Sequence, residues 1–241
     1  NHWFKKYKIK AKYSFIEVAN QNFDKEVLKK INDEKTHGIN ITIPYKKKII
    51  KYLDNKTAHA KKIGAVNCVT IGKKIKGTNT DWKGYLSSIK NQKIHKNKNI
   101  LILGFGGAAQ AILYGLSIKG YKNIHIFNRS KKIVTLGGTK KYTKKYSLIN
   151  NYLKDADLII NTTPTNPIKT KQANLVKPTT IISDIVYKPK NTRFLNSFKK
   201  NKKIYGISML TEQATYCFKD WFGFLPTIDK GLATKLNKKI I

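Results

Sequence analysis

The order of apolar and polar positions predicts strands alternating with helices along the second half of the chain. Residues 99–103 form a short run rich in Ile and Leu, which is typical of a buried parallel strand. The following residues, 106–118, are mostly small and apolar, as expected of a helix packed on a sheet. Further strands are predicted at 123–128, 140–143, 157–160, 179–186 and 203–205, with helices at 130–136, 192–199, 208–222 and 229–239. This βαβ alternation predicts a doubly wound parallel sheet.

The first half of the chain predicts a second, smaller α/β unit. Alternating aromatic and β-branched positions predict a strand over residues 12–18, and residues 38–43 predict another, which Pro44 ends. Residues 2–8 resemble the end of a helix. Further helices are predicted at 23–31, 45–53, 57–63 and 81–90, with two short strands between 64 and 77. The Lys- and Asn-rich segment 91–98 is the predicted boundary between the two units.

Composition limits the kinds of protein that this chain can be. With 40% hydrophobic residues it can bury a core, and no apolar run approaches the roughly 18 residues that cross a bilayer. No secretory signal precedes the first strand-like segment, and the two cysteines, Cys68 and Cys217, are far apart. We therefore expect a cytoplasmic protein without disulfides, without a membrane partner and without a metal site.

The net charge of +36 raises the question of a polyanionic partner. However, 47 of the 49 basic residues are Lys, whereas proteins that read nucleic acids rely heavily on Arg. The lysines are spread over the whole chain, and Asn and Ile are also abundant. This pattern favours compositional drift in an AT-rich genome and no specific nucleic-acid partner, with a basic nucleic-acid-binding protein as the alternative.

A glycine motif follows the strand at 99–103. Gly104, Gly106 and Ala109 have the spacing G-x-G-x-x-A between a predicted strand and a predicted helix. This arrangement suits a dinucleotide pyrophosphate, because Gly104 permits the tight turn, Gly106 lets the backbone approach the phosphates and Ala109 lets the helix pack closely. The alternative is an ordinary tight turn between a strand and a helix.

Further motifs occur in a fixed order along nearly the whole chain. They are N-I-T-I-P-Y-K at 40–46, G-A-V-N at 64–67, G-T-N-T-D at 77–81, G-F-G-G-A-A at 104–109, N-R-S at 128–130, N-T-T-P at 161–164, D-I-V-Y at 184–187 and G-I-S-M-L-T-E-Q at 206–213. Together they resemble the motifs of the shikimate dehydrogenase family. The resemblance implies a Rossmann-like NADP-binding domain at 84–210, and an α/β catalytic domain formed by 1–83 and 211–241.

The resemblance also implies which residues act in the reaction between NADPH and 3-dehydroshikimate, a step toward the aromatic amino acids. The catalytic residues carry over to Lys46 and Asp81. The substrate-binding residues carry over to Thr42, Lys46, Asn67, Asp81, Tyr187 and Gln213. The cofactor-binding residues carry over to Gly104, Phe105, Gly106, Gly107, Ala108, Asn128, Arg129, Ser130, Ile185 and Gly206.

The chain departs from the family pattern at several positions. The family begins with a strand and a Ser-x-Ser that holds the substrate carboxylate, whereas this sequence starts inside the helix that follows, so it is expected to be N-terminally truncated. Without those two serines, we expect it to bind NADP⁺ but to bind shikimate weakly or to fold poorly. Cys68 stands where the family usually has Thr, and Pro164 where it has Ser. The basic residue expected after the Asn-Arg pair aligns only loosely, with Lys131 or Lys132 nearby.

Each candidate side chain also has a structural alternative. Ketone reduction needs a hydride donor and a proton donor, which Lys46 can supply with Asp81 as its partner. Lys46 is one of 47 lysines, and Asp81 could simply cap its helix. The amides of Asn67 and Gln213 suit a polyol, but they could be a turn residue and a surface residue. Thr42 could be only a strand former, and Tyr187 only a core residue.

The choice of cofactor depends on Arg129. A site for NAD usually places Asp or Glu after its second strand, whereas Arg suits the 2′-phosphate of NADP. Arg129 directly follows the predicted strand with no carboxylate nearby in sequence, so we expect NADP. The alternatives are a quinate/shikimate dehydrogenase that uses NAD and a non-catalytic dinucleotide-binding remnant. The sequence does not determine whether the protein forms a homodimer.

Overall fold

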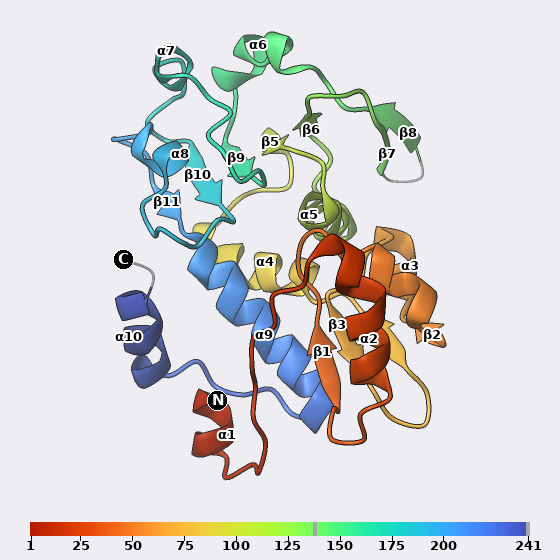
Figure 1. The fold of residues 1–241 in the computed structure, drawn as a ribbon. Helices are drawn as coiled ribbons and strands as arrows, with labels where there is room; N and C mark the ends of the chain where they lie inside the picture. Colours follow the sequence, from red (N-terminus) through yellow and green to blue (C-terminus); the bar gives the residue numbers. More distant parts are fainter. Residues whose placement is uncertain (137–138, 240–241) are drawn as a thin grey trace.

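The computed structural model describes residues 1–136 and 139–239 of the 241-residue chain. Its larger sheet has five parallel strands in the order β11-β10-β9-β5-β6 (Figure 1). These strands are β5 (Ile100–Leu103), β6 (Ile124–Phe127), β9 (Leu158–Asn161), β10 (Ile181–Asp184) and β11 (Lys203–Ile204). The predicted α/β architecture with a parallel, Rossmann-like sheet is confirmed.

Both faces of this sheet are covered, which explains the uninterrupted apolar run of β5. Ile100 and Ile102 pack into one core cluster with residues of α5 (Gly107–Ile118) and α4 (Asp81–Ile89). Leu101 and Leu103 point the other way, into a cluster with residues of α6 (Asn150–Leu153) and α8 (Arg193–Asn196). All four side chains are fully buried, so no polar residue is tolerated in this strand.

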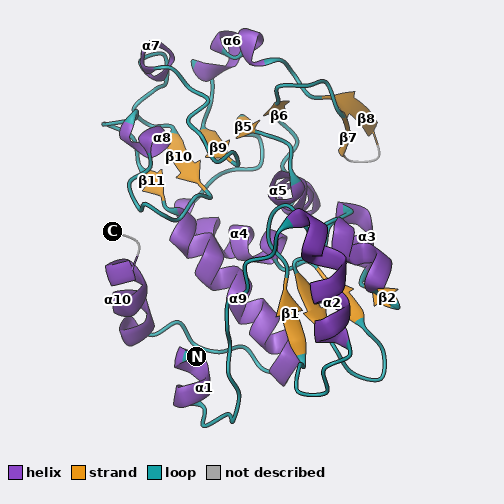
Figure 2. Ribbon diagram, viewed as in Figure 1, coloured by secondary structure: helices purple, strands orange, loops and turns teal. Residues whose placement is uncertain are grey.

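The smaller sheet has four short strands in the order β1-β3-β4-β2 (Figure 2). They are β1 (Gly38–Asn40), β2 (Asn55–Lys56), β3 (Cys68–Thr70) and β4 (Lys76–Thr78), of which only β2 and β4 pair in parallel. Its core joins residues of α2 (Phe23–Ile31), η2 (Lys48–Tyr52) and α3 (Ala58–Ile63), including Phe23, Ile49 and Ala60.

Helix α4 and the long helix α9 (Gly206–Phe222) lie between the sheets. Figure 1 shows α4 and α9 in the middle of the molecule, with the five-stranded sheet on one side and the four-stranded sheet on the other. A Cβ at Gly84 of α4 would lie 2.5 Å from the Cβ of Gln213 on α9. The helices therefore approach each other closely at a position where α4 has no side chain, and Gln213 sits at that crossing.

The two ends of the described chain are joined. Helix α1 (His2–Lys6) lies beside the segment that leads into α10 (Lys230–Lys239), where Lys6 Nζ is 2.7 Å from an Asp229 carboxylate oxygen. Trp3 Nε1 donates to the carbonyl oxygen of Thr227 at 2.9 Å. The hydrogen bond from Lys6 lowers the pKa of Asp229. The remaining short elements are η1 (Asn20–Asn22), η3 (Lys90–Gln92), η4 (Tyr146–Leu148) and α7 (Thr170–Ala173).

Two predicted elements are wrong. The strand expected at 12–18 is absent, because this segment has no adjacent strand to pair with and leaves Phe15 80% exposed. The helix expected at 130–136 is instead an antiparallel hairpin of β7 (Ile133–Leu136) and β8 (Thr139–Tyr142). Ile133, Val134 and Thr135 are β-branched and favour a strand, and Val134 is buried in the core beside α5.

A third prediction is only partly right. The helix expected at 45–53 is a series of turns followed by the 3₁₀ helix η2, and β1 ends at Asn40 instead of continuing to residue 43. Residues 41–47 therefore form an irregular connection after β1. Lys46 lies within it, and its carbonyl oxygen accepts the N–H of Val66 at 2.8 Å.

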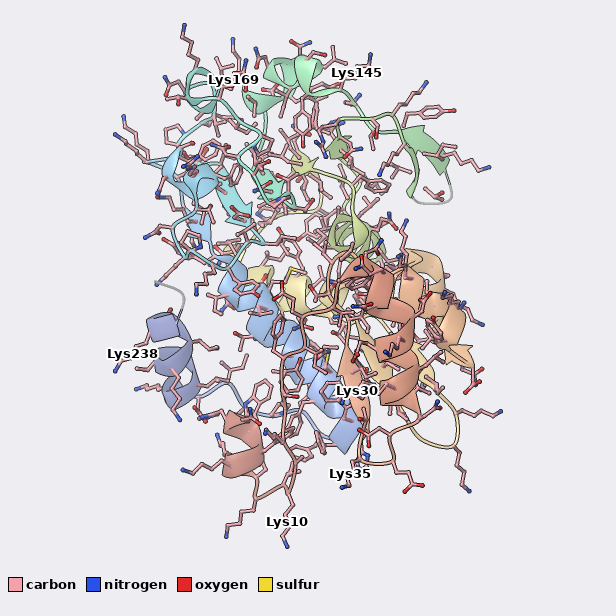
Figure 3. All side chains as sticks on the ribbon, in the orientation of Figure 1. Lys10, Lys30, Lys35, Lys145, Lys169 and Lys238 are labelled. Atoms are coloured by element: carbon pink, nitrogen blue, oxygen red, sulfur yellow. The ribbon has the colours of Figure 1, made fainter. Side chains whose placement is uncertain are left out.

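The basic side chains are distributed around the whole outline. In Figure 3, the labelled Lys10, Lys30, Lys35, Lys145, Lys169 and Lys238 lie at separate places on the molecule. This distribution matches a solvated surface better than a single polyanion-binding patch. No helix in the described residues is long and apolar enough to cross a membrane.

Candidate active site

Lys46 and Asp81 form an ion pair at the junction of the two sheets. Lys46 Nζ lies 2.5 Å from Asp81 Oδ2, and the two side chains are 14% and 5% exposed. Such a short, charge-assisted hydrogen bond is stronger where water is largely excluded. The sequence predicted this pairing from two separate motifs, and the structure brings the two residues together.

Asp81 is the first residue of α4, and its carboxylate bonds side chains outside that helix. Thr80 occupies the N-cap position of α4, and Asp81 is the first helical residue. The backbone N–H of Asp81 donates to Asn79 Oδ1 at 3.1 Å, while its carboxylate contacts Lys46 Nζ and Asn67 Nδ2. The alternative in which Asp81 serves only as a helix cap is therefore wrong.

An amide network continues from this pair toward α9. Asn67 Nδ2 lies 2.9 Å from Thr80 Oγ1, 3.0 Å from Asp81 Oδ1 and 3.1 Å from Gln213 Oε1. Asn67 Oδ1 accepts the backbone N–H of Thr80 at 2.7 Å. Asn67 and Thr80 are buried at 3% and 2% exposure, so their orientation is fixed by these bonds. Lys46, Asn67, Asp81 and Gln213 thus form one cluster.

The sequence analysis missed Thr80 and Asn79 as members of this cluster. Thr80 bonds both amides, and Asn79 Nδ2 donates to the carbonyl oxygen of Ala65 at 2.9 Å. Both lie inside the motif G-T-N-T-D, where two polar residues directly precede the acidic one. That local signal could have marked them as residues that hold the turn before α4.

Two predicted substrate residues lie outside this hydrogen-bonded cluster. Thr42 is exposed, and its carbonyl oxygen accepts the N–H of Tyr45 in the turn that carries Lys46. Tyr187 is 45% exposed after β10, so it is not the core residue considered as an alternative. Among the described residues, no hydrogen bond joins either side chain to Lys46, Asp81, Asn67 or Gln213.

The glycine-rich turn has the geometry of a phosphate site. Gly104 has φ +95°, and a Cβ there would lie 2.7 Å from Thr162 Oγ1 and from Thr163 Cγ2, so only Gly fits. Gly106 is the N-cap of α5, has no side-chain cap and faces open space. The first N–H groups of α5 are therefore available to an anion, and the residues fit a dinucleotide pyrophosphate. Phe105 and Ala108 beside this turn are buried.

The catalytic pair lies beside this turn. A Cβ at Gly107, the first residue of α5, would be 3.6 Å from Lys46 Cδ and 3.7 Å from Ala65 Cβ. The stem of Lys46 therefore runs along the N-terminus of α5. Its charged end, paired with Asp81, therefore belongs to a side chain that runs past the glycine-rich turn.

Arg129 lies at the carboxyl end of β6. Asn128 Nδ2 donates to the carbonyl oxygen of Ser130 at 2.9 Å and shapes this turn, while the Arg129 side chain is exposed. Within residues 1–136 and 139–239, no carboxylate forms an ion pair with Arg129. The cation is therefore free to contact a phosphate beside the sheet edge, where ligands of such folds bind.

Ile185 and Gly206, two further residues predicted to bind the cofactor, are in contact at the start of α9. A Cβ at Gly206 would lie 2.5 Å from the carbonyl oxygen of Ile185, so these two residues are in direct contact. The preceding Asp184 is 1% exposed and accepts from Thr192 Oγ1 at 2.6 Å, from Val186 N at 3.0 Å and from Asn161 Nδ2 at 3.2 Å. Burial raises the pKa of Asp184, and these three donors oppose that rise.

Tyr146 lies beneath the glycine-rich turn. Its ring packs 6.4 Å from that of Phe127, and its hydroxyl is buried without a hydrogen-bond partner among the described residues. Burial raises the pKa of Tyr146 to about 12, while the nearby Gly104 backbone and Arg129 act in the opposite direction. Tyr146 thus supports the turn through packing.

The chain is similar to shikimate dehydrogenases in both sequence and structure. Two family models match, the shikimate dehydrogenase substrate binding domain over residues 1–69 and shikimate / quinate 5-dehydrogenase over residues 87–193. A shikimate dehydrogenase (NADP(+)) of Bartonella quintana is 32% identical and covers 98% of this chain and 86% of its own. Another, of Clostridium beijerinckii, is 36% identical, with 92% and 84% covered. The crystal structure of shikimate dehydrogenase 1 from Peptoclostridium difficile matches with a TM-score of 0.82 and 26% identity, covering 99% of this chain and 90% of that one.

Proposed function

The chain belongs to the shikimate dehydrogenase family, and from this premise we propose the roles that its own residues take in the reaction. It is an NADP-dependent oxidoreductase acting on a CH–OH group, which interconverts shikimate and 3-dehydroshikimate. The cofactor supplies or takes up the hydride when it is bound. The observation that carries the assignment of roles is the buried Lys46–Asp81 pair beside the N-terminus of α5.

Lys46 is the proton donor and acceptor. In the reducing direction, Nζ gives a proton to the ketone oxygen as that oxygen gains negative charge, and in the oxidising direction it takes the proton from the hydroxyl. Asp81 fixes the ammonium through the bond between Oδ2 and Nζ. Its carboxylate has further lone pairs and accepts a hydrogen bond from a substrate hydroxyl.

The remaining polar residues position the substrate. Asn67 and Gln213 belong to the same hydrogen-bonded cluster as the catalytic pair, which supports their contact with the polyol. Thr42 and Tyr187 are exposed on the connections that follow β1 and β10, so their side chains are accessible to a ligand. We assign these four residues to substrate binding together with Lys46 and Asp81.

The cofactor is NADP, and we assign its binding to three turns at the edge of the five-stranded sheet. The first runs from Gly104 through Ala108 and binds the pyrophosphate. The second, Asn128 to Ser130, places Arg129 at the 2′-phosphate. The third consists of Ile185 and Gly206, which touch each other and lie beside the nicotinamide end.

The arrangement of elements supports two domains that meet along α4 and α9. We propose that 84–210 form the NADP-binding domain and that 1–83 with 211–241 form the catalytic domain. Residues 137–138 and 240–241 of these ranges lie outside the described residues. A cytoplasmic location and a homodimer also remain predictions, which cell fractionation and sedimentation would test.

The test is a coupled assay of NADP⁺ reduction with shikimate, with quinate and without a substrate. We expect NADPH formation with shikimate, little with quinate and none without substrate. An intact protein that binds NADP⁺ but oxidises neither compound would contradict the assignment. Faster turnover of quinate with NAD⁺ would favour the quinate-oxidising alternative.

A further inference from the structure

Cys217 lies one helical turn after Gln213 on α9, at the back of the substrate cluster. Its thiol is 1% exposed and contacts polar side chains from two other segments. Asn40 Nδ2 donates to Cys217 Sγ at 3.0 Å, and Thr80 Oγ1 lies 3.2 Å from the sulfur. Cys217 Sγ in turn donates to Gln213 Oε1 at 3.5 Å, within the range of hydrogen bonds to sulfur.

The amide of Gln213 is thereby held in one orientation. Its Oε1 faces donors from Asn67 at 3.1 Å, Thr80 at 3.2 Å and Cys217 at 3.5 Å. Its Nε2 donates one hydrogen to the carbonyl oxygen of Leu210 at 3.0 Å. An amide nitrogen has two hydrogens, so one N–H remains for a ligand. If the amide were flipped, its NH₂ group would face the NH₂ group of Asn67, which can only donate, and the contacts with Thr80 and Cys217 would have to reverse their direction.

We propose that Cys217 is a positioning residue, whose thiol holds Gln213 so that its Nε2 offers an N–H to an acceptor oxygen of the substrate. This inference rests on the proposed function, because it assumes that Gln213 contacts the substrate. It adds a restriction on specificity. The substrate atom at Gln213 is a hydrogen-bond acceptor, and a donor at that place is rejected because the amide cannot turn.

Asn40, which donates a hydrogen bond to the sulfur of Cys217, supports this role. Asn40 is itself fixed, since its Nδ2 also donates to the carbonyl oxygen of Asn67 at 3.2 Å and its Oδ1 accepts from Tyr13 Oη at 3.0 Å. Asn40 therefore donates to the sulfur, and the thiol hydrogen of Cys217 is left to point toward Gln213, Thr80 or the adjacent thiol of Cys68. The thiol links the fixed Asn40 to the substrate-facing amide.

Cys68 provides a matched control. It is the second buried cysteine, at 0% exposure, and pairs with Asn40 in the register of β1 and β3. Its thiol lies next to that of Cys217, and burial raises the pKa of Cys68. Among the described residues, no hydrogen bond joins Cys68 to Gln213. Removing the Cys68 thiol therefore changes the same buried region without removing a bond to the amide.

The first experiment compares steady-state kinetics of Cys217→Ala, Cys217→Ser and Cys68→Ala with shikimate and NADP⁺. Loss of one hydrogen bond corresponds to about a 2–10-fold effect, so we expect KM for shikimate to rise by that factor in Cys217→Ala. The Ser variant keeps a donor and an acceptor and should restore KM to within about twofold. Cys68→Ala should leave KM unchanged, and kcat and KM for NADP⁺ should stay within about twofold in all three variants.

The second experiment tests whether Cys217 acts through Gln213. If it does, adding Cys217→Ala to Gln213→Ala should produce no further rise in KM for shikimate. Multiplicative effects, or an unchanged KM in Cys217→Ala, would overturn the proposal while leaving the proposed function intact. If Gln213→Ala itself leaves KM unchanged, the substrate role of Gln213 fails as well. If the Ala variant does not fold, Cys217→Val replaces it, because it fills a similar volume without a hydrogen bond.

Discussion

Lys46 and Asp81 are 35 residues apart in the chain, yet Nζ of the first lies 2.5 Å from Oδ2 of the second. Lys46 comes from the irregular connection after β1, and Asp81 from the first turn of α4. The pair is shielded from water on most sides. It therefore singles out one lysine among 47 as the candidate acid and base.

Replacing Lys46 with Ala should lower kcat by about 10²–10⁴, the usual effect of a positioned acid and base. The affinity for NADP⁺ should hardly change, because the phosphate-binding turn is intact. The free energy of unfolding should fall by about 3–5 kcal/mol, since Asp81 is left buried without its partner. Steady-state kinetics and chemical denaturation would measure the two effects.

Lys47→Ala and Lys48→Ala are the matched controls for that variant. Both lysines are exposed neighbours in the same segment, and neither contacts Asp81 in the described structure. Their kcat values should be close to that of the wild type. A Lys46→Ala enzyme with near-normal kcat would refute the assignment of the proton donor.

Asp81→Asn should also lower kcat, because an amide holds the ammonium of Lys46 less firmly and changes the contact with the substrate hydroxyl. If Lys46 and Asp81 act as a unit, the double variant should be little slower than the slower single variant. The measurement is kcat for all four proteins under saturating conditions. Rate losses that multiply in the double variant would show that the residues act independently.

Arg129→Asp should shift the preference from NADP⁺ toward NAD⁺. It removes a cation that pairs with the 2′-phosphate and introduces a carboxylate that repels it. The quantity to measure is the ratio of kcat/KM for NADP⁺ to that for NAD⁺. Arg193→Asp, which makes the same charge change at the exposed start of α8, should leave this ratio unchanged. If Arg129→Asp also leaves it unchanged, Lys131 or Lys132 becomes the candidate.

Tyr146→Phe should make the protein less sensitive to alkali. The pKa of Tyr146 is raised from 10.0 to about 12 in the folded protein, so the unfolded chain loses this proton first. Ionisation therefore opposes folding increasingly between pH 10 and about pH 12 in the wild type. The variant lacks this contribution, and its melting temperature should fall less over that interval. Tyr142→Phe, at a 60% exposed position, should follow the wild type.

The sequence was sufficient for the parts of the site that depend on local pattern. The unbroken apolar run of β5 requires two covered faces, and the glycine spacing after it requires a tight turn. Lys46, Asn67 and Asp81 each lie in a short motif beside a strand or helix end. For these residues, the assignment came from the resemblance of the motifs to the family, because each side chain taken alone also had a structural alternative.

The parts of the fold and of the site that the sequence did not predict depend on contacts between distant segments. Cys217 becomes part of the site only because α9 crosses α4 at Gly84, which no local pattern reveals. The alternation at 12–18 predicts a strand, but a strand also needs a neighbour for its backbone groups. Residues 133–135 lie in a hairpin because Val134 has a place in the core beside α5.

In the proposed site, helix α9 sets the distance between Gly206, assigned to the cofactor, and Gln213, assigned to the substrate. Gly206, against Ile185, and Gln213, against Asn67, are seven residues apart on it, which is nearly two turns and about 10 Å of axial rise. Both residues therefore lie on the same side of the helix. Inserting a single residue between them would rotate Gln213 by about 100° and lengthen the gap by about 1.5 Å. The chain would keep every residue of the site but lose the registration between hydride and substrate, so insertions and deletions should be excluded from this segment.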